Sequence, residues 1–300
     1  MAHALLMVGR MNHGVRFGMA VLCAGVAAMM ALASALGVFA RGDGAVEAAT
    51  SIRGELFHYV TTGVYAFNAE RVVAEGVGWD WFTLVIAAPA LLVASVFVAR
   101  GSLRGRLFAL GLLGYAFYQY LMYATTWAFG PLFPLFIALY AASLAGIVWI
   151  TSTVDLATVA ADLGPGFPRR RMAALCVVMA VVLLGMWSQR IALGLLHEPP
   201  PLLGGTTMVV PALDLGLVVP PCLWNAVMVW RTRPIGYLLS AVLVVKGFTM
   251  AAAIVAMLIS AWATEGKLEV QSLVVFGLFA AGLGWLGLRM YAPPRSIQLA

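Results

Sequence analysis

Apolar residues lie along this chain in eight long runs. A helix needs about 20 predominantly apolar residues to cross a bilayer, and charged residues or clusters of glycine and proline separate the runs. The predicted fold class is therefore an all-α, polytopic transmembrane helix bundle that forms a single domain over residues 1–300. The expected spans are residues 15–40, 81–99, 107–129, 131–152, 172–193, 208–230, 234–262 and 269–289.

The composition favours a membrane protein and excludes a soluble enzyme, a disordered chain and a disulfide-stabilised scaffold. The 300 residues are 63% hydrophobic and 10% charged, whereas an average soluble domain carries about 25% charged residues. The mean hydropathy is +0.98. Cys23, Cys176 and Cys222 lie far apart in apolar runs, which indicates buried thiols rather than a metal site.

The charged side chains predict the orientation of the spans. Cytoplasmic loops of membrane proteins carry an excess of Lys and Arg. With the N-terminus inside, the inner loops and tails hold twelve basic and two acidic residues, and the outer segments hold five basic and nine acidic residues. Both termini are therefore expected in the cytoplasm. The net charge of +6 then follows from orientation, and no nucleic-acid partner is expected.

The first run shares features with a secretory signal peptide. It follows Arg10 and Arg16 and ends near Ala-Ser-Ala at residues 33–35. Because its apolar stretch is longer than the core of a signal peptide, a retained membrane anchor is expected. Cleavage would instead leave seven spans and a new N-terminus outside.

Two connecting segments have features of their own. Residues 41–80 form the longest loop, expected outside, and their mixture of apolar and polar residues predicts one or two amphipathic helices on the outer surface. Trp79 and Trp81 flank Asp80 at the expected start of the second span, where tryptophan suits the interface and aspartate suits a helix N-cap. Residues 153–171 are predicted to be a basic cytoplasmic linker.

The second and third runs superpose on the sixth and seventh without a gap. Pro89 falls on Pro220, and Arg100 falls on Arg231; we call this alignment the Pro89–Pro220 register. Two halves of four spans each would form a parallel repeat with its axis along the membrane normal. The alternative is two helical hairpins that share the same turn chemistry.

Two charged residues, Asp214 and Lys246, remain inside the predicted spans. A charge at the centre of a bilayer costs at least about 2.5–3.5 kcal/mol, so such residues usually have a partner or a function. The rise of an α-helix places both at a similar depth on adjacent antiparallel helices, which predicts an ion pair facing the bundle interior. The pair is interpreted either as a structural link or as a substrate, ion or proton site.

The sixth run has an unusual backbone around Asp214. Pro211, Gly216 and Pro220 surround this residue, and proline frees a carbonyl that lipid cannot satisfy. Broken helices of this kind often line transporter sites, although a kinked packing helix fits the same residues. Asn225 lies deeper on the run and is expected to line the same cavity.

Polar side chains also recur along one face of the third run. Tyr115, Gln119 and Tyr123 are spaced at i, i+4 and i+8, which places them on one side of a helix. We interpret this face as the lining of an outer cavity; an aromatic belt at the interface is the alternative. The Pro89–Pro220 register makes Tyr115 equivalent to Lys246.

Several polar residues of the outer loops are candidates for the mouth of such a cavity. Their spacing matches no metal-binding motif, so no metal, catalytic residue or cofactor is expected. The candidates are His58, Glu70, Arg190, His197 and Glu198.

Four pieces of the sequence resemble a family of uncharacterised bacterial multi-pass inner-membrane proteins. The resemblance covers the second to seventh runs, implies a bacterial plasma (inner) membrane location and carries no activity. The pieces are the turn from Arg100 to Arg106, Tyr115-x-x-Tyr118 with Tyr123, the segment from Asp214 to Pro220, and Pro234-Ile-Gly-Tyr237 followed by Lys246.

Together these patterns favour an integral membrane protein that binds or translocates a small solute or ion at Asp214 and Lys246. One alternative is a non-transporting structural or accessory subunit whose Asp–Lys pair only fixes helix packing. A second is a membrane enzyme that acts on lipid at the outer leaflet through His58, His197 or Glu198. The expected partners are the lipid bilayer and a small solute or ion; a homo-oligomer or a larger membrane complex stays open.

Overall fold

The computed structural model describes residues 12–164, 166–196 and 201–291. Over this part of the chain, eight helices are long and apolar enough to cross a membrane. Two of them are interrupted by a π-helical turn, labelled η. The eight helices are α2 (His13–Phe39), α3–η1–α4 (Glu70–Phe82, Thr83–Ala87 and Ala88–Ala99), α5 (Leu103–Thr126), α6 (Phe133–Ser152), α8 (Arg169–Leu196), α9–η2–α10 (Val209–Leu213, Asp214–Val218 and Val219–Trp230), α11 (Pro234–Glu265) and α12 (Val270–Tyr291).

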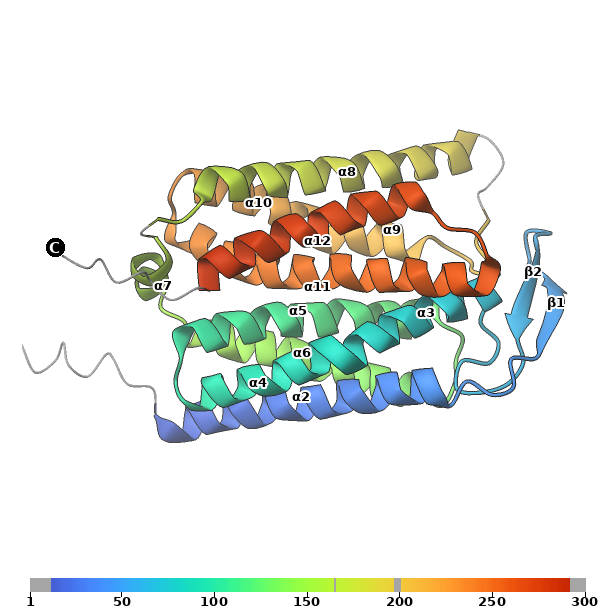
Figure 1. The fold of residues 1–300 in the computed structure, drawn as a ribbon, viewed down its shortest axis with the longest axis horizontal. Helices are drawn as coiled ribbons and strands as arrows, with labels where there is room; N and C mark the ends of the chain where they lie inside the picture. Colours follow the sequence, from blue (N-terminus) through green and yellow to red (C-terminus); the bar gives the residue numbers. More distant parts are fainter. Residues whose placement is uncertain (1–11, 165, 197–200, 292–300) are drawn as a thin grey trace, which may run out of the picture.

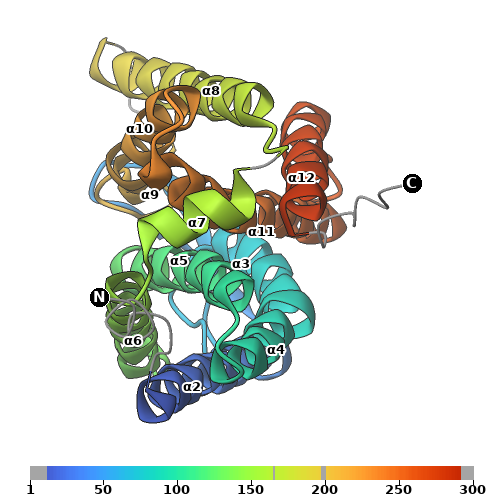
Figure 2. The ribbon, with the colours of Figure 1, turned by 90° about the vertical axis from the view of Figure 1, so that its left-hand side faces the viewer.

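The helices form two groups of four (Figure 1). We call α2 to α6 the first group and α8 to α12 the second group. Seen from the end of the bundle, α5 and α11 lie side by side at the centre, while α2 and α8 lie at opposite far sides (Figure 2). The start of α2 and the end of α12 lie at the same end of the bundle (Figure 1).

Local side-chain chemistry explains where several helices begin and end. Ser102 caps α5, since its hydroxyl accepts a hydrogen bond from the Gly105 amide at 3.1 Å. Asp155 caps the short helix α7 (Leu156–Leu163) in the same way, accepting from the Thr158 hydroxyl and amide. These hydrogen bonds lower the pKa of the Asp155 carboxyl. Gly266, with a φ of 71°, ends α11 in the left-handed conformation.

The segment 41–80 differs from the prediction of amphipathic surface helices. It contains an antiparallel hairpin of β1 (Val46–Thr50) and β2 (Leu56–Val60), followed by α3, which is continuous with the second span. The hairpin is consistent with the rich content of β-branched and aromatic residues in 56–60, where partly buried and exposed side chains alternate.

The predicted interface position of Trp79 and Asp80 is also wrong. Both lie inside α3 and are buried, with 5% and 1% of their surfaces exposed. The residue at the N-cap of this helix is Ala69. The second span therefore begins at Glu70, well before the predicted start, because Arg71 and Glu75 in its first turns form ion pairs within the protein.

The helix bounds of the two groups agree in the Pro89–Pro220 register. In this alignment η1, α4 and the first residue of α5 coincide with η2, α10 and the first residue of α11. The turns after α4 and α10 match as well. Gly101 and Thr232 both have a positive φ, of 79° and 54°, and their amides donate to Val98 and Val229 at 2.9 and 3.1 Å.

Candidate functional site

A cavity of about 790 Å³ lies between the second group and the facing sides of α3 and α5. This volume is typical of sites that hold a small organic molecule. The cavity reaches from the end of the bundle that carries the hairpin to η2. Its walls are mostly apolar and include six methionines, Met122, Met179, Met186, Met208, Met250 and Met257.

Asp214 lies at the inner end of this cavity, as the first residue of η2. Its carboxylate accepts two hydrogen bonds, one on each oxygen. The Tyr118 hydroxyl donates to Oδ1 at 2.5 Å, and the Trp187 indole N–H donates to Oδ2 at 2.8 Å. Asp214 is therefore held by one residue from each group, Tyr118 on α5 and Trp187 on α8. π-Helical turns occur frequently at functional sites.

Lys246 lines the same cavity but does not form the predicted ion pair with Asp214. The ammonium and the carboxylate do not come within the 4.0 Å of an ion pair, and none of the pairs among the described residues joins them. Instead, Lys246 Nζ lies 4.6 Å from the centre of the Tyr118 ring, a cation–π contact. Tyr118 thus contacts both charged groups, and Asp214 already accepts from two other donors.

The predicted polar face of α5 is largely closed to this cavity. Tyr115 and Gln119 are fully buried, and both hydrogen-bond to Thr83 Oγ1, at 2.6 and 3.1 Å. Tyr123 does line the cavity. Tyr118, which lies off the predicted face, is the tyrosine that reaches the charged residues. Of the three residues on the predicted face, Tyr115 and the Gln119 carbonyl bond to Thr83, while the buried Gln119 Nε2 has no hydrogen-bond partner among the described residues.

Asn225 does not line the cavity. Its side-chain amide donates to the Ser240 hydroxyl at 3.1 Å and to the Cys176 sulfur at 3.4 Å. These contacts join α10, α11 and α8 in a buried cluster farther from the hairpin than η2. The predicted polar track therefore ends at Asp214, and Asn225 helps to close the bundle beyond it.

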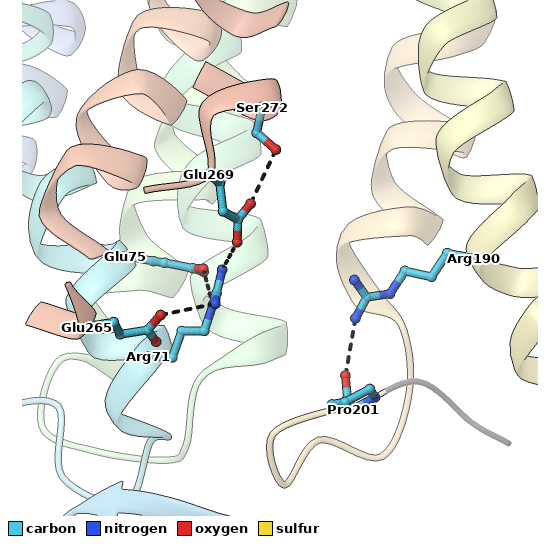
Figure 3. Close-up of polar contacts among 7 residues, drawn as sticks. All are labelled: Arg71, Glu75, Arg190, Pro201, Glu265, Glu269 and Ser272. Atoms are coloured by element: carbon cyan, nitrogen blue, oxygen red, sulfur yellow. Dashed lines mark hydrogen bonds and ion pairs between the residues drawn. The ribbon is translucent and has the colours of Figure 1, made fainter. Parts of the chain in front are cut away.

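Charged residues gather at the mouth of the cavity (Figure 3). Arg71 donates to Glu75 at 3.0 Å, to Glu265 at 3.2 Å and to Glu269. The interactions join the beginning of α3 to the end of α11 and the segment before α12. Arg190 stands apart from this cluster and donates to the Pro201 carbonyl at 3.1 Å (Figure 3). Sequence reasoning selected Arg190 but missed Arg71, whose pairing with Glu75 is signalled by the i, i+4 spacing.

The other predicted residues of the mouth are not brought together. His58 is exposed on β2 and Glu70 is exposed at the start of α3, and neither lines the cavity. His197 and Glu198 lie outside the described residues. Within the described ranges, no group of His, Cys, Asp and Glu side chains could hold a metal ion.

A second buried carboxyl group lies inside the first group. Asp80 Oδ2 accepts a hydrogen bond from the Tyr65 hydroxyl at 2.5 Å, and Oδ1 accepts from Tyr123 at 3.5 Å. None of the ion pairs in the described part of the chain includes Asp80. Gly37 lets α2 come close enough for this packing, since a Cβ there would collide with Tyr65 and Asp80.

Comparison with known proteins finds no match for this chain among family models, curated proteins or solved structures. The class of protein therefore follows from the fold and composition. The chain is a mostly helical bundle whose eight long apolar helices indicate a multi-pass membrane protein.

Proposed function

We propose that this membrane protein binds a small, largely apolar solute and moves it across the bilayer. The cavity that extends from the mouth to Tyr118, Asp214 and Lys246 is the observation that carries this proposal. Its apolar walls suit the body of the solute, and the polar groups at its inner end suit a hydrogen-bonding or charged substituent.

The same cavity disfavours a purely structural role for Asp214 and Lys246. A structural pair would be expected to form a direct contact in a closed interior, because a buried charge is costly without a close partner. Here both residues line an open cavity, and Tyr118 contacts both of them. Their opposite charges attract each other across a separation longer than an ion pair. Of the residues named for the alternative of an outer-leaflet enzyme, His58 lies away from the cavity, and His197 and Glu198 lie outside the described residues.

The distribution of charge supports an orientation with both termini in the cytoplasm. The ends of α4 and α10 and the starts of α5 and α8 carry arginines at the end of the bundle opposite the hairpin. Basic residues favour the cytoplasmic side. In this orientation the cavity opens to the outside. The resemblance to bacterial multi-pass proteins supports a location in the bacterial inner membrane.

The shared helix bounds support a parallel four-plus-four repeat. The Pro89–Pro220 register makes Thr83 equivalent to Asp214 and Tyr115 equivalent to Lys246. A transporter built in this way changes access to its site by moving one group of helices relative to the other. The packing of α11 against both α3 and α5 joins the two groups, and it is the surface about which such movement would occur.

Site-directed labelling tests the accessibility of the cavity. Met186→Cys should react with a membrane-impermeant maleimide added from the outside, because Met186 lines the cavity. Ala180→Cys on the same helix is the matched control, since Ala180 is fully buried elsewhere. The three natural cysteines are also buried. Equal lack of reaction at Met186 and Ala180 would contradict an outward-open site.

Solute binding can be tested without knowing the solute. Native mass spectrometry of the protein released from nanodiscs should show a co-purifying small molecule. Met250→Trp, which fills the cavity, should lose it, whereas Ile259→Trp on the exposed side of α11 should keep it. Retention of the molecule by Met250→Trp would place its binding elsewhere and overturn the proposal.

A further inference from the structure

The polar groups of the cavity differ in how much of their hydrogen-bonding capacity is used. Asp214 accepts one hydrogen bond on each carboxylate oxygen, and Arg71 is shared among three carboxylates. By contrast, Lys246 Nζ makes no hydrogen bond to any described residue; it lies over the face of Tyr118 and interacts electrostatically with Asp214 and Cys222. An ammonium has three N–H donors, and a carboxylate can accept about four hydrogen bonds. At the inner end of the cavity, Lys246 therefore has all of its donors unused, whereas Asp214 has used about half of its acceptor sites.

Arg190 adds unused donors nearer the mouth. It lies one helical turn beyond Trp187, the residue that holds Asp214, and it donates one hydrogen bond to a carbonyl oxygen. A guanidinium has five N–H groups in total. A molecule in this cavity therefore meets two cations with free donors, and the accessible carboxylates are already paired or hydrogen-bonded.

The rest of the cavity suits a flexible apolar chain. Its six methionines have unbranched, adaptable side chains that pack against irregular apolar shapes. Val182 and Met186 of α8 and Phe276 and Phe279 of α12 line it together. These two helices pack little against each other, unlike α2 and α6 of the first group. Side chains of α8 and α12 thus line the cavity at a place where these two helices pack little against each other.

We infer that the solute is an amphiphilic anion, with one acidic head group on an unbranched alkyl chain. The head group accepts hydrogen bonds from Lys246, and the chain lies along the methionine-lined wall. This inference deepens the proposed function and rests on it, because it names the class of molecule that the same cavity takes.

The charge of the head group can be read from two substitutions with opposite effects. Lys246→Met removes the donor, and charge-assisted hydrogen bonds are strong enough that affinity for the anion should fall by about tenfold or more. Asp214→Asn removes the nearby negative charge and should raise that affinity, by about threefold. For a cationic solute, Lys246→Met should raise the affinity and Asp214→Asn should lower it. For a zwitterionic solute, both substitutions should lower the affinity.

The experiment uses bromoundecanoate, bromoundecanol and bromoundecylamine, all brominated at the sixth carbon so that the bromine stays near a head group held at Lys246. Bromine quenches tryptophan, and Trp187 lies at the inner end of the cavity. The full-length protein is held in phosphatidylcholine nanodiscs, and the signal of Trp187→Phe is subtracted to remove quenching of lipid-facing tryptophans. The acid should quench Trp187 saturably and bind more tightly than the alcohol or the amine.

Control variants separate charge from folding. Lys246→Arg keeps the positive charge and should bind the acid nearly as well as the natural protein, while size-exclusion chromatography reports the folding of each variant. Lys267→Met removes the other lysine of the chain, which is exposed outside the cavity, and should change nothing. The inference is overturned if the alcohol binds as tightly as the acid or if Asp214→Asn weakens the acid.

The two proposals fail in different ways. If all three molecules bind equally and Met250→Trp blocks all of them, the cavity binds solutes but the head group is not selected as an anion. If none binds saturably and Met250→Trp has no effect on the co-purifying molecule, the cavity is not a solute site and both proposals fall. The rate of Trp187 quenching can be compared when the acid is supplied in the lipid and when it is supplied in the aqueous phase. The faster delivery shows whether the acid enters the cavity from the bilayer or from water.

Discussion

The two helix groups follow a similar plan but differ in what fills their interiors. In the first group, Tyr120, Tyr123 and Phe136 pack ring against ring, and their side chains leave little space. In the second group, the corresponding region is the cavity. The same arrangement of helices can therefore be closed by aromatic side chains or left open when methionine and smaller side chains replace them.

The polar residues of the two groups also differ in whether they bond to each other. Thr83 and Tyr115 of the first group hydrogen-bond directly at 2.6 Å, whereas Asp214 and Lys246, their equivalents in the Pro89–Pro220 register, stay apart. A neutral pair satisfies itself and needs nothing from outside. A charged pair separated by a tyrosine ring leaves donors unused at Lys246.

The largest difference between the two groups is expected in the stability lost when a large interior side chain is removed. Tyr120→Ala removes a fully buried ring from the first group and should lower the free energy of unfolding by about 3–5 kcal/mol. Met250→Ala only enlarges an existing cavity and should cost about 1 kcal/mol. Denaturant titration in detergent measures both values. Equal losses would mean that the second interior is as tightly packed as the first.

The second largest difference is expected between the two buried carboxyl groups, Asp80 and Asp214, in the stability lost when each is removed. Asp80→Ala leaves the Tyr65 hydroxyl without an acceptor in a closed interior, at a cost of about 2–3 kcal/mol. In Asp214→Ala the Tyr118 hydroxyl faces the cavity, where water can replace the carboxylate, so about 1 kcal/mol is expected. Thermal unfolding in nanodiscs compares the two variants. A larger loss for Asp214→Ala would contradict a hydrated cavity.

Residues of the first group can be introduced into the second. The double variant Asp214→Thr, Lys246→Tyr should build the neutral hydrogen bond found between Thr83 and Tyr115. Its free energy of unfolding should stay within about 1 kcal/mol of the natural protein, while solute binding falls at least about tenfold. Native mass spectrometry and denaturant titration check the two halves of this prediction. Unchanged binding would show that these residues do not contact the solute.

The turns after α4 and α10 have different residues at the position with a positive φ. Thr232 has a φ of 54°, a conformation that β-branched residues rarely adopt, where the first group has Gly101. Thr232→Gly should therefore stabilise the protein by about 1 kcal/mol. The reverse change, Gly101→Thr, should destabilise it. A thermal-shift assay resolves the sign of each change, and a loss of stability in Thr232→Gly would rule out strain at this turn.

The smallest expected effect concerns the hairpin, which occurs only in the first group among the described residues. Asp43 accepts hydrogen bonds from the Thr62 hydroxyl and the Ala45 amide, and these bonds lower the pKa of its carboxyl. The bonds therefore support the folded hairpin above the ordinary pKa of an aspartate, about 3.9, and this support is lost as the pH falls through the lower folded pKa. Pepsin should therefore cut residues 46–60 faster at a pH below the pKa of Asp43 in the folded protein. Asp43→Asn should remove the pH dependence.

Patterns of apolar residues predicted the long helices well because membrane spans depend on length and hydropathy alone. The start of α11 was predicted at Pro234, where the structure has it, since proline suits the first turn of a helix. The start of α3 was missed because Arg71 and Glu75 resemble solvated residues until Glu265 and Glu269, far away in the sequence, come beside them.

The candidate site was only partly predictable. The charges of Asp214 and Lys246 identified the region of the cavity, because a charge within an apolar run stands out. Tyr118 did not stand out among the neighbouring tyrosines, and Asp80 was assigned to the interface by its position near two tryptophans. Which of several equivalent side chains faces a cavity depends on the rotation of each helix, and this rotation is set by packing between distant segments.

The π-helical turn at Asp214 also sets the rotation of α9 relative to α10 about their common helix axis. A helix advances by about 100° per residue, so the additional residue of a π turn rotates everything before it relative to everything after it. Removing exposed Gly216 would return η2 to α-helical spacing and swing Asp214 away from Tyr118 while α10 keeps its packing. We expect a single-codon deletion to turn Asp214 away from the cavity wall without altering the residues of α10.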